Sequence, residues 1–307
     1  MKKRIHLFIV IGILLVGFIL GSIFDYQIDQ ALYSDKNTFG LIMASFGVYP
    51  CYAGLAFIGG GLLETTLQRK ELPLLLRICC FGLSGVAYIM SVILCGREWP
   101  SVNGYDVPQL AWLSYLISAL VFAGVYALAY FVCRSGNQKQ MWNVLVVMMV
   151  IFVAALLPAG FVIKLIIHRP RYRYAVRLGA TEFKSWWEMF PGYKELVDTE
   201  VDCITLTKEE FKSFPSGHSG TGMIMAMFLP YASVFFSKLK GKETLLFYIG
   251  ALFGFIMMFS RMLVGAHYLT DTCMGSLIVM VVFFLVNEYA IRKKNLMNKM
   301  LNKRNNK

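Results

Sequence analysis

Long apolar stretches recur along this 307-residue chain and limit the folds open to it. A helix needs about 20 mostly apolar residues to cross a bilayer, because every backbone polar group must be hydrogen-bonded within the helix. The alternation typical of barrel strands is absent. The sequence therefore predicts an all-α, polytopic transmembrane bundle of about eight spans, at roughly 5–24, 41–63, 72–95, 110–133, 141–163, 220–237, 245–265 and 271–291.

Two of these stretches are less regular than the others. The first follows Met1-Lys2-Lys3-Arg4, which is also how a cleaved signal peptide begins. Its apolar run is long for a signal peptide and no A-x-A-like cleavage site follows, so we interpret it as a retained helix. The sixth is the weakest, because Pro230 lies near its middle.

The composition excludes a disordered chain and argues against a soluble enzyme. Hydrophobic residues make up 57% of the chain and charged residues only 16%, against about 25% charged residues in a soluble domain. The net charge of +12 would indicate a nucleic-acid partner in a soluble protein. In a membrane protein the same excess of Lys and Arg indicates, before any partner, how the helices are oriented across the membrane.

The distribution of Lys and Arg predicts the orientation of the bundle. They concentrate at residues 2–4, in alternate short loops and in the basic tail 292–307, so we expect both termini to be cytoplasmic in a multi-pass cell-membrane protein. The segment 164–219 opposes this rule, since it carries nine Lys and Arg on the outer side. A cluster of cations that breaks the rule needs another explanation.

Three short segments at the outer membrane level hold most of the unusual polar residues. The first runs from Lys164 to Arg173, and its Lys164 and Arg171 would share a face if the helix continued past Pro170. A basic collar that binds anionic lipid headgroups is the alternative interpretation.

The second segment, Ser213–Gly220, contains Pro-Ser-Gly-His and precedes the sixth span. Ser at a helix entry predicts an N-cap, and the free N–H groups there suit phosphate; a simple cap is the alternative. The third segment, Ser260–Asp271, places Arg261, His267 and Asp271 in or beside spanning helices. Such residues are costly in a membrane and indicate function, with a buried ion pair as the alternative.

Together the segments favour phosphoryl chemistry. Lys164, Arg171 and Arg261 supply three cations for a dianionic phosphoryl group, while His218 and His267 supply an acid and a nucleophile. No acidic cluster suited to Mg²⁺ and no zinc ligand set is present, so we expect no metal and no cofactor. On this interpretation the positive charge needs no nucleic-acid partner.

The order Lys-x6-Arg, Pro-Ser-Gly-His and Ser-Arg-x5-His-x3-Asp resembles the three motifs of the type 2 phosphatidic acid phosphatase family, whose superfamily includes glucose-6-phosphatase and the vanadium haloperoxidases. The second and third motifs match at 215–218 and 260–271. The first departs, since Tyr172 stands where relatives usually have Pro after the Arg. Arg169-Pro170 has the Arg-Pro dipeptide, but Lys164 is then two residues too close to the arginine. The spacing from Lys164 therefore assigns Arg171 as the first-motif arginine, and Arg169 stays an alternative.

The resemblance implies a phosphatase/haloperoxidase-like helical core and a mechanism. His267, oriented by Asp271, would attack phosphorus and form a phosphohistidine, and His218 would protonate the leaving oxygen and then activate water. The phosphate-binding groups would be Lys164, Arg171, Arg261 and the amides around Ser216 and Gly217.

The chain divides into residues 1–140, whose helices the resemblance does not explain, a catalytic core at 141–291 with an extracytoplasmic loop at 165–219, and the tail 292–307. The loop holds an aromatic cluster that predicts an interfacial lid, or else ordinary packing of a cap: Phe183, Trp186, Trp187, Met189, Phe190 and Tyr193.

We therefore expect metal-independent removal of phosphate from a membrane lipid phosphate or pyrophosphate at the outer face. Candidate substrates are undecaprenyl pyrophosphate, phosphatidic acid and phosphatidylglycerol phosphate. A lipid phosphotransferase and a non-catalytic lipid-phosphate transporter or flippase are the alternatives. The oligomeric state is open, because Gly59-Gly60-Gly61 suits either a helix contact between copies or packing within the chain.

Overall fold

The computed structural model describes residues 2–34, 36–98, 111–157, 162–177, 183–190, 192–201 and 204–305. The predicted fifth span thus includes residues 158–161, which lie outside the described part. The long helices are α1 (Lys2–Leu32), α3 (Tyr49–Gln68), α4 (Leu74–Gly96), α5 (Ala111–Arg134), α6 (Gln138–Leu157), α10 (Gly217–Phe235), α11 (Glu243–Leu263) and α12 (Leu269–Asn305). The short elements are α2 (Thr38–Phe46), α7 (Lys164–Ile167), α8 (Tyr172–Arg177), α9 (Tyr193–Leu196), β1 (Glu200–Val201), β2 (Ile204–Thr205) and the 3-10 helices η3 (Lys208–Phe211) and η4 (Ser237–Leu239).

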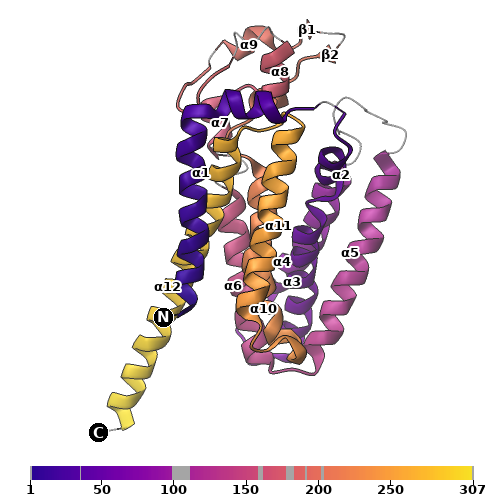
Figure 1. Ribbon diagram of the computed structural model, residues 1–307. Helices are drawn as coiled ribbons and strands as arrows, with labels where there is room; N and C mark the ends of the chain where they lie inside the picture. The colour runs from indigo at the N-terminus through magenta and orange to yellow at the C-terminus, as the bar shows by residue number, and fades with distance from the viewer. Residues whose placement is uncertain are drawn as a thin grey trace.

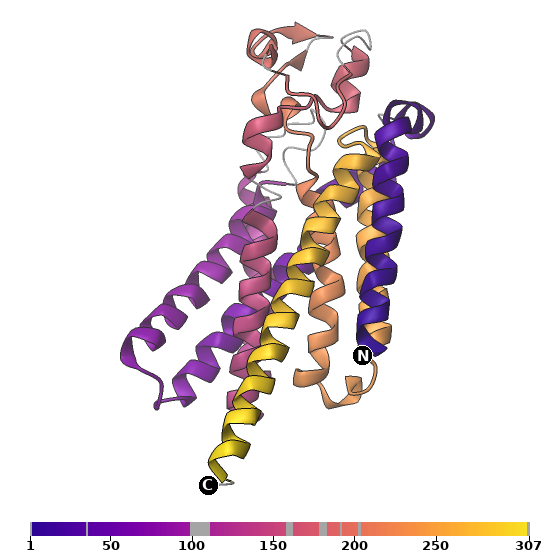
Figure 2. The same cartoon turned by 90° about the vertical axis from the view of Figure 1, so that its left-hand side faces the viewer.

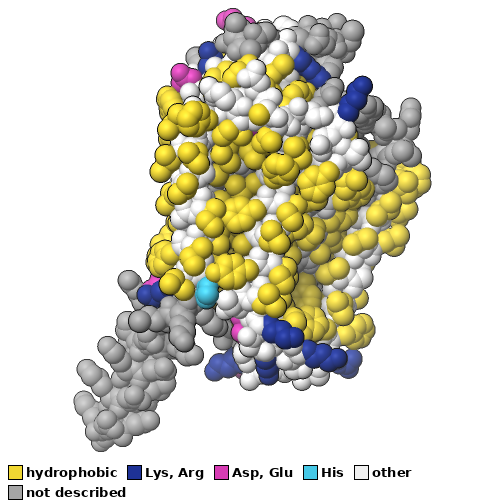
Figure 3. Space-filling model, in the orientation of Figure 1, with side chains coloured by type: hydrophobic (Ala, Val, Ile, Leu, Met, Phe, Trp, Pro, Cys, Tyr) yellow, Lys and Arg dark blue, Asp and Glu magenta, His cyan; other side chains and the backbone are white. Residues whose placement is uncertain are grey.

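The helices confirm a polytopic membrane protein of the all-α class. Seven of the described helical segments are long and apolar enough to cross a bilayer, with α2 and α3 together forming one of them, Thr38–Gln68. Apolar side chains cover the middle of the molecule in Figure 3, while Lys and Arg gather toward its two ends. The only strands in the described ranges are β1 and β2, a two-residue antiparallel pair.

Helix α10 occupies the predicted sixth span but is not among those seven segments. It carries polar or small residues in its first turns, including Ser219 and Thr221, and it packs against α11, α12 and α6. A helix enclosed by other helices needs no lipid-facing surface, and polar groups are tolerated on faces that meet the bundle interior. This burial accounts for the weak apolar character of the sixth stretch.

The N-terminal helices are integrated with the rest of the bundle. Helix α1 runs along α12, as Figures 1 and 2 both show, while α3, α4 and α5 pack on one another and reach the remaining helices through α6 and α10. The glycine triplet 59–61 faces α4, α5 and α6 of the same chain; a Cβ on Gly60 would lie 2.0 Å from the carbonyl oxygen of Tyr126. Close packing within the chain explains these glycines.

The loop segment forms a small cap at one end of the bundle, and both termini lie at the opposite end (Figures 1 and 2). The cap has a core of its own, in which Tyr174, Leu206 and Phe211 are buried. Phe190 and Tyr193 pack against this core. The predicted aromatic cluster is therefore divided, since these two rings stabilise the cap while Trp187 is 56% exposed.

Candidate active site

The three polar segments meet between the cap and the helix ends, and backbone hydrogen bonds join them in pairs. The Ser213 N–H donates to the Arg169 carbonyl at 3.0 Å, and the Ser216 N–H donates to the Asp271 carbonyl at 2.9 Å. The Arg173 N–H donates to the carbonyl of Gly265 at 3.0 Å. Segments far apart in the sequence are thus fixed at one level of the bundle.

The first segment does not continue as a helix. Helix α7 ends at Ile167, and His168 adopts a left-handed conformation with φ of 51°. The Pro170 signal is therefore right: the helix does not continue, so the condition for a shared helical face of Lys164 and Arg171 is not met. The chain turns here, so the two cations reach the same site by way of a bend.

The second segment forms the predicted N-cap of α10. The Ser216 hydroxyl accepts a hydrogen bond from the Ser219 N–H at 3.3 Å. A Cβ on Gly275 of α12 would lie only 2.2 Å from the Ser216 carbonyl oxygen. Glycine at this position lets α12 approach the start of α10 at backbone distance.

His267 lies in the turn between α11 and α12 and is 1% exposed. Its Nδ1 lies 2.7 Å from the Ser213 carbonyl oxygen, which can only accept, so Nδ1 carries the hydrogen and Nε2 keeps its lone pair. Burial, Arg171 and Lys164 hold the pKa of His267 well below its usual value against the opposing effect of Asp271. A neutral imidazole with a free Nε2 is suited to act as a nucleophile.

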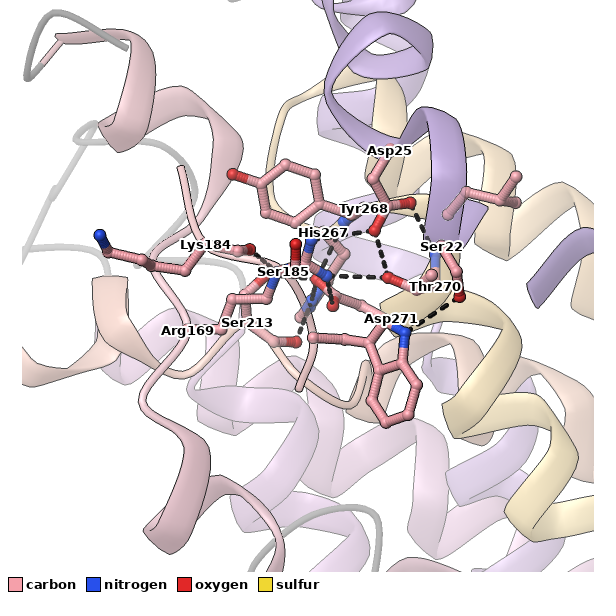
Figure 4. Close-up of polar contacts among 12 residues, drawn as sticks. Ser22, Asp25, Arg169, Lys184, Ser185, Ser213, His267, Tyr268, Thr270 and Asp271 are labelled. Atoms are coloured by element: carbon pink, nitrogen blue, oxygen red, sulfur yellow. Dashed lines mark hydrogen bonds and ion pairs between the residues drawn. The ribbon is translucent and has the colours of Figure 1, made fainter. Parts of the chain in front are cut away.

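Asp271 lies behind His267 and is not its direct partner. The nearest carboxylate oxygen, Oδ2, is 3.7 Å from Nδ1, beyond hydrogen-bonding range. That oxygen instead accepts from the Ser213 hydroxyl and, at 2.9 Å, from the Tyr268 N–H (Figure 4). Asp271 thus holds the segment whose carbonyl orients the imidazole.

Arg169 is fully buried beneath the site, and its guanidinium is occupied. Nη1 donates to Asp271 Oδ1 at 2.6 Å, Nη2 donates to Asp25 Oδ2 at 2.9 Å, and Nε donates to the Lys184 carbonyl at 2.7 Å. These contacts, drawn in Figure 4, direct Arg169 into an ion-pair network. Of the two first-motif arginines, Arg171 is the one whose side chain is not held by carboxylates in the described structure.

The three candidate phosphate-binding cations act on the two histidines: Lys164 and Arg171 on His267, and Arg261 on His218. Burial, followed by the charge of Arg171, lowers the pKa of Lys164 to about 8. Arg171 is half-buried, and its Nε donates to the Glu209 carbonyl at 3.1 Å. Arg261 is buried, and among the described residues its Nε and Nη1 have no hydrogen-bond partner. Unpaired buried donors of this kind are costly unless an anion binds them.

His218 occupies the second position of α10 and pairs with a residue from the N-terminal half. Its Nε2 lies 3.2 Å from Oε2 of Glu98, which follows α4. Burial raises the pKa of Glu98, but His218, Arg97 and Arg261 outweigh it and bring the pKa to about 2. Burial and the charge of Arg261 lower the pKa of His218, and the ionised carboxylate of Glu98 opposes them in favour of the protonated, acid form.

The sequence missed Asp25, Glu98 and Ser213 as parts of this site. The predicted first span ends at residue 24, and only the structure extends this span to Leu32 and so places Asp25 within it, where an Asp is a functional signal. Nothing in the sequence indicated that Glu98 lies near His218. In the described ranges no group of three or more His, Cys, Asp or Glu is arranged to hold a metal ion.

Comparison with known proteins gives a family match over this part of the chain. The model of the PAP2 superfamily matches residues 143–294, which include α10, α11 and the three polar segments. No significant match was found among the curated proteins or the solved structures.

Proposed function

The chain belongs to the PAP2 superfamily, and from that premise we propose that it releases phosphate from a membrane lipid phosphate or pyrophosphate through a phosphohistidine intermediate. This superfamily includes phosphatases, which supports a phosphoester hydrolase. The observation that carries the proposal is that the segments of His267 and His218 are joined by a hydrogen bond from the Ser216 N–H to the Asp271 carbonyl, and that cations act on both imidazoles. Lys164 acts on both, Arg171 on His267 and Arg261 on His218.

In the proposed first step, the lone pair on Nε2 of His267 forms a bond to phosphorus and the bond to the leaving oxygen breaks. Protonated His218 gives its proton to that oxygen. Lys164, Arg171, Arg261 and the amides near Ser216 and Gly217 would stabilise the charge on the other phosphoryl oxygens.

In the second step, water attacks phosphorus while His218 accepts one of its protons. The nitrogen–phosphorus bond breaks, its electron pair returns to Nε2 of His267, and inorganic phosphate leaves. Splitting one displacement into two steps with positioned acid–base groups is the general advantage of covalent catalysis.

The proposed substrate is a lipid that reaches the site from the outer membrane surface, with both termini in the cytoplasm. The aromatic cluster supports an interfacial position for the lipid beside α1. A cavity of about 430 Å³ lies between the outer part of α1 and residues 183–187, lined in part by Tyr26, Trp186 and Trp187. Trp186 donates to the Ser22 hydroxyl of α1 at 3.0 Å, and Trp187 points outward, as expected of an interfacial anchor.

Purified protein tests the proposal. Incubation with undecaprenyl pyrophosphate, phosphatidic acid or phosphatidylglycerol phosphate should release inorganic phosphate with and without EDTA, and His267→Ala should abolish release. Absence of release from all three lipids, or activity retained by His267→Ala, would overturn it. Transfer of labelled phosphate to an added lipid alcohol would assign a phosphotransferase, and binding that survives His267→Ala without turnover would assign a transporter.

A further inference from the structure

Helix α1 lies outside the region that matches the PAP2 superfamily, yet it places a carboxylate beneath the active site. Asp25 is 4% exposed and lies in the outer part of α1. Its Oδ2 pairs with Arg169 at 2.9 Å, and its Oδ1 accepts from the Thr270 N–H at 3.0 Å. The Thr270 hydroxyl also donates to Asp25.

Two acidic residues therefore share one buried arginine. Asp25 and Asp271 bind different amino groups of Arg169, whose guanidinium also lies 3.9 Å from the centre of the Tyr268 ring. Figure 4 shows the pathway from Asp25 through Arg169 and Thr270 to Asp271 and His267. With both carboxylates ionised, the three side chains carry one net negative charge, and the enclosed position leaves that charge little screened by water.

This charge has a consequence for the chemistry at His267. Attack on phosphorus by a neutral imidazole places positive charge on the ring. That charge is stabilised by the Ser213 carbonyl at Nδ1 and by net negative charge behind it. Without Asp25, Arg169 would balance Asp271 alone, and these two side chains together would carry no net charge.

We propose that Asp25 of α1 is a positioning residue for catalysis, which acts through Arg169 and Thr270 on Asp271 and thereby on His267. The inference rests on the proposed phosphatase activity, and it gives α1 a role in the reaction. A purely structural clamp between α1 and α12 is the alternative explanation for the same contacts.

The test compares Asp25→Asn with Asp29→Asn, using phosphate release from phosphatidic acid in detergent micelles. The two acids lie one turn apart on α1 and are both buried, but the Asp29 carboxylate has no hydrogen-bond partner among the described residues. We expect Asp25→Asn to lower kcat and the rate of phosphohistidine formation about 10-fold with KM unchanged, the loss typical of a partner one step behind a reacting group. Asp29→Asn should stay within about twofold of the wild type, because the Asp29 carboxylate makes no hydrogen bond to Arg169, Thr270 or Asp271.

A double-mutant cycle distinguishes an effect of Asp25 through Arg169 from a general loss of folding. Asp25→Asn leaves Arg169 partly unpaired, whereas Asp25→Asn with Arg169→Gln removes one charge of each sign. If Asp25 acts through Arg169, the double variant should have the same kcat as Arg169→Gln alone.

Several outcomes overturn the inference while leaving the proposed function intact. These are a wild-type kcat in Asp25→Asn, a lower unfolding temperature with kcat of the folded protein unchanged, an increase in KM alone, or equal losses in the two Asn variants. Inactive wild-type protein, by contrast, would overturn the proposed function itself.

Discussion

The sharpest prediction concerns Asp271→Asn, because the geometry at His267 departs from a directly bonded Asp–His pair. In Ser-His-Asp proteases the Asp bonds the imidazole directly, and the Asn substitution costs about 10⁴-fold in kcat through loss of the correct tautomer. In this protein Nδ1 lies 2.7 Å from the Ser213 carbonyl and 3.7 Å from Asp271. The tautomer should therefore survive in Asp271→Asn.

The expected loss of activity follows from that difference. A partner one step behind the reacting group typically contributes about 10–100-fold, which is about 1.4–2.7 kcal/mol in activation free energy. The free energy of unfolding should also fall. Both carboxylate oxygens of Asp271 accept hydrogen bonds, Oδ1 from Arg169 and Oδ2 from Ser213 and Tyr268. Whichever oxygen the amide nitrogen of Asn replaces, that nitrogen would face a donor. One unsatisfied buried group costs about 1–3 kcal/mol.

The assay measures kcat and KM for phosphate release from phosphatidic acid, the amplitude of the phosphohistidine burst and the unfolding temperature in detergent. His267→Gln sets the level of complete loss, with no phosphoenzyme. A burst of normal amplitude at a reduced rate supports the geometry. A loss of about 10⁴-fold in a variant that unfolds like the wild type would refute the assignment of Ser213 as the partner of Nδ1.

Three further predictions follow from the same site. Because Lys164 has a pKa of about 8 and binds phosphate only when charged, KM should rise as the pH increases above 8. Lys164→Arg should remove that rise, since Arg stays charged. The same increase of KM at alkaline pH in the variant would contradict the role of Lys164 in binding phosphate. Glu98→Gln should lower kcat about 10-fold for a lipid phosphate but little for p-nitrophenyl phosphate, because the p-nitrophenolate leaving group needs no proton from His218. Equal losses of kcat for the two substrates would contradict the role of Glu98. Trp187→Ala should raise KM for a long-chain lipid phosphate more than for a soluble ester, and equal KM effects of Trp187→Ala on both substrates would contradict the lid hypothesis. Trp186→Ala loses the hydrogen bond to Ser22 and the contact with Phe214, so it should lower the unfolding temperature.

The first motif shows where sequence spacing stops being informative. Spacing favoured Arg171 over Arg169, but it gave no role to the second arginine. Arg169 is buried with Asp25 and Asp271, a partnership between residues 144 and 102 positions away in the chain. Contacts at such separations depend on how the helices pack, so no local pattern predicts them.

The aromatic segment shows a similar limit. The composition of 183–193 predicted an interfacial cluster, and two residues of it, Trp187 and Met189, are exposed as that hypothesis requires. Phe190 and Tyr193 face the cap core, and Trp186 packs on Phe18 of α1. Residues adjacent in an irregular segment have no fixed periodicity, so their directions are set by what they pack against.

The sequence by itself determined the membrane class, the approximate helix boundaries and the identity of the polar segments, because the bilayer requires long apolar helices and makes charged residues rare within them. It also indicated Ser216 as a helix cap, since capping is a local property of a few residues. Only the tertiary structure decided which groups pair: the Ser213 carbonyl with His267, Glu98 with His218, and Asp25 of the first helix with Arg169. Buried charges must find partners wherever packing brings them together, and in this bundle Asp25 and Glu98 come from the part of the chain before the family-matched region.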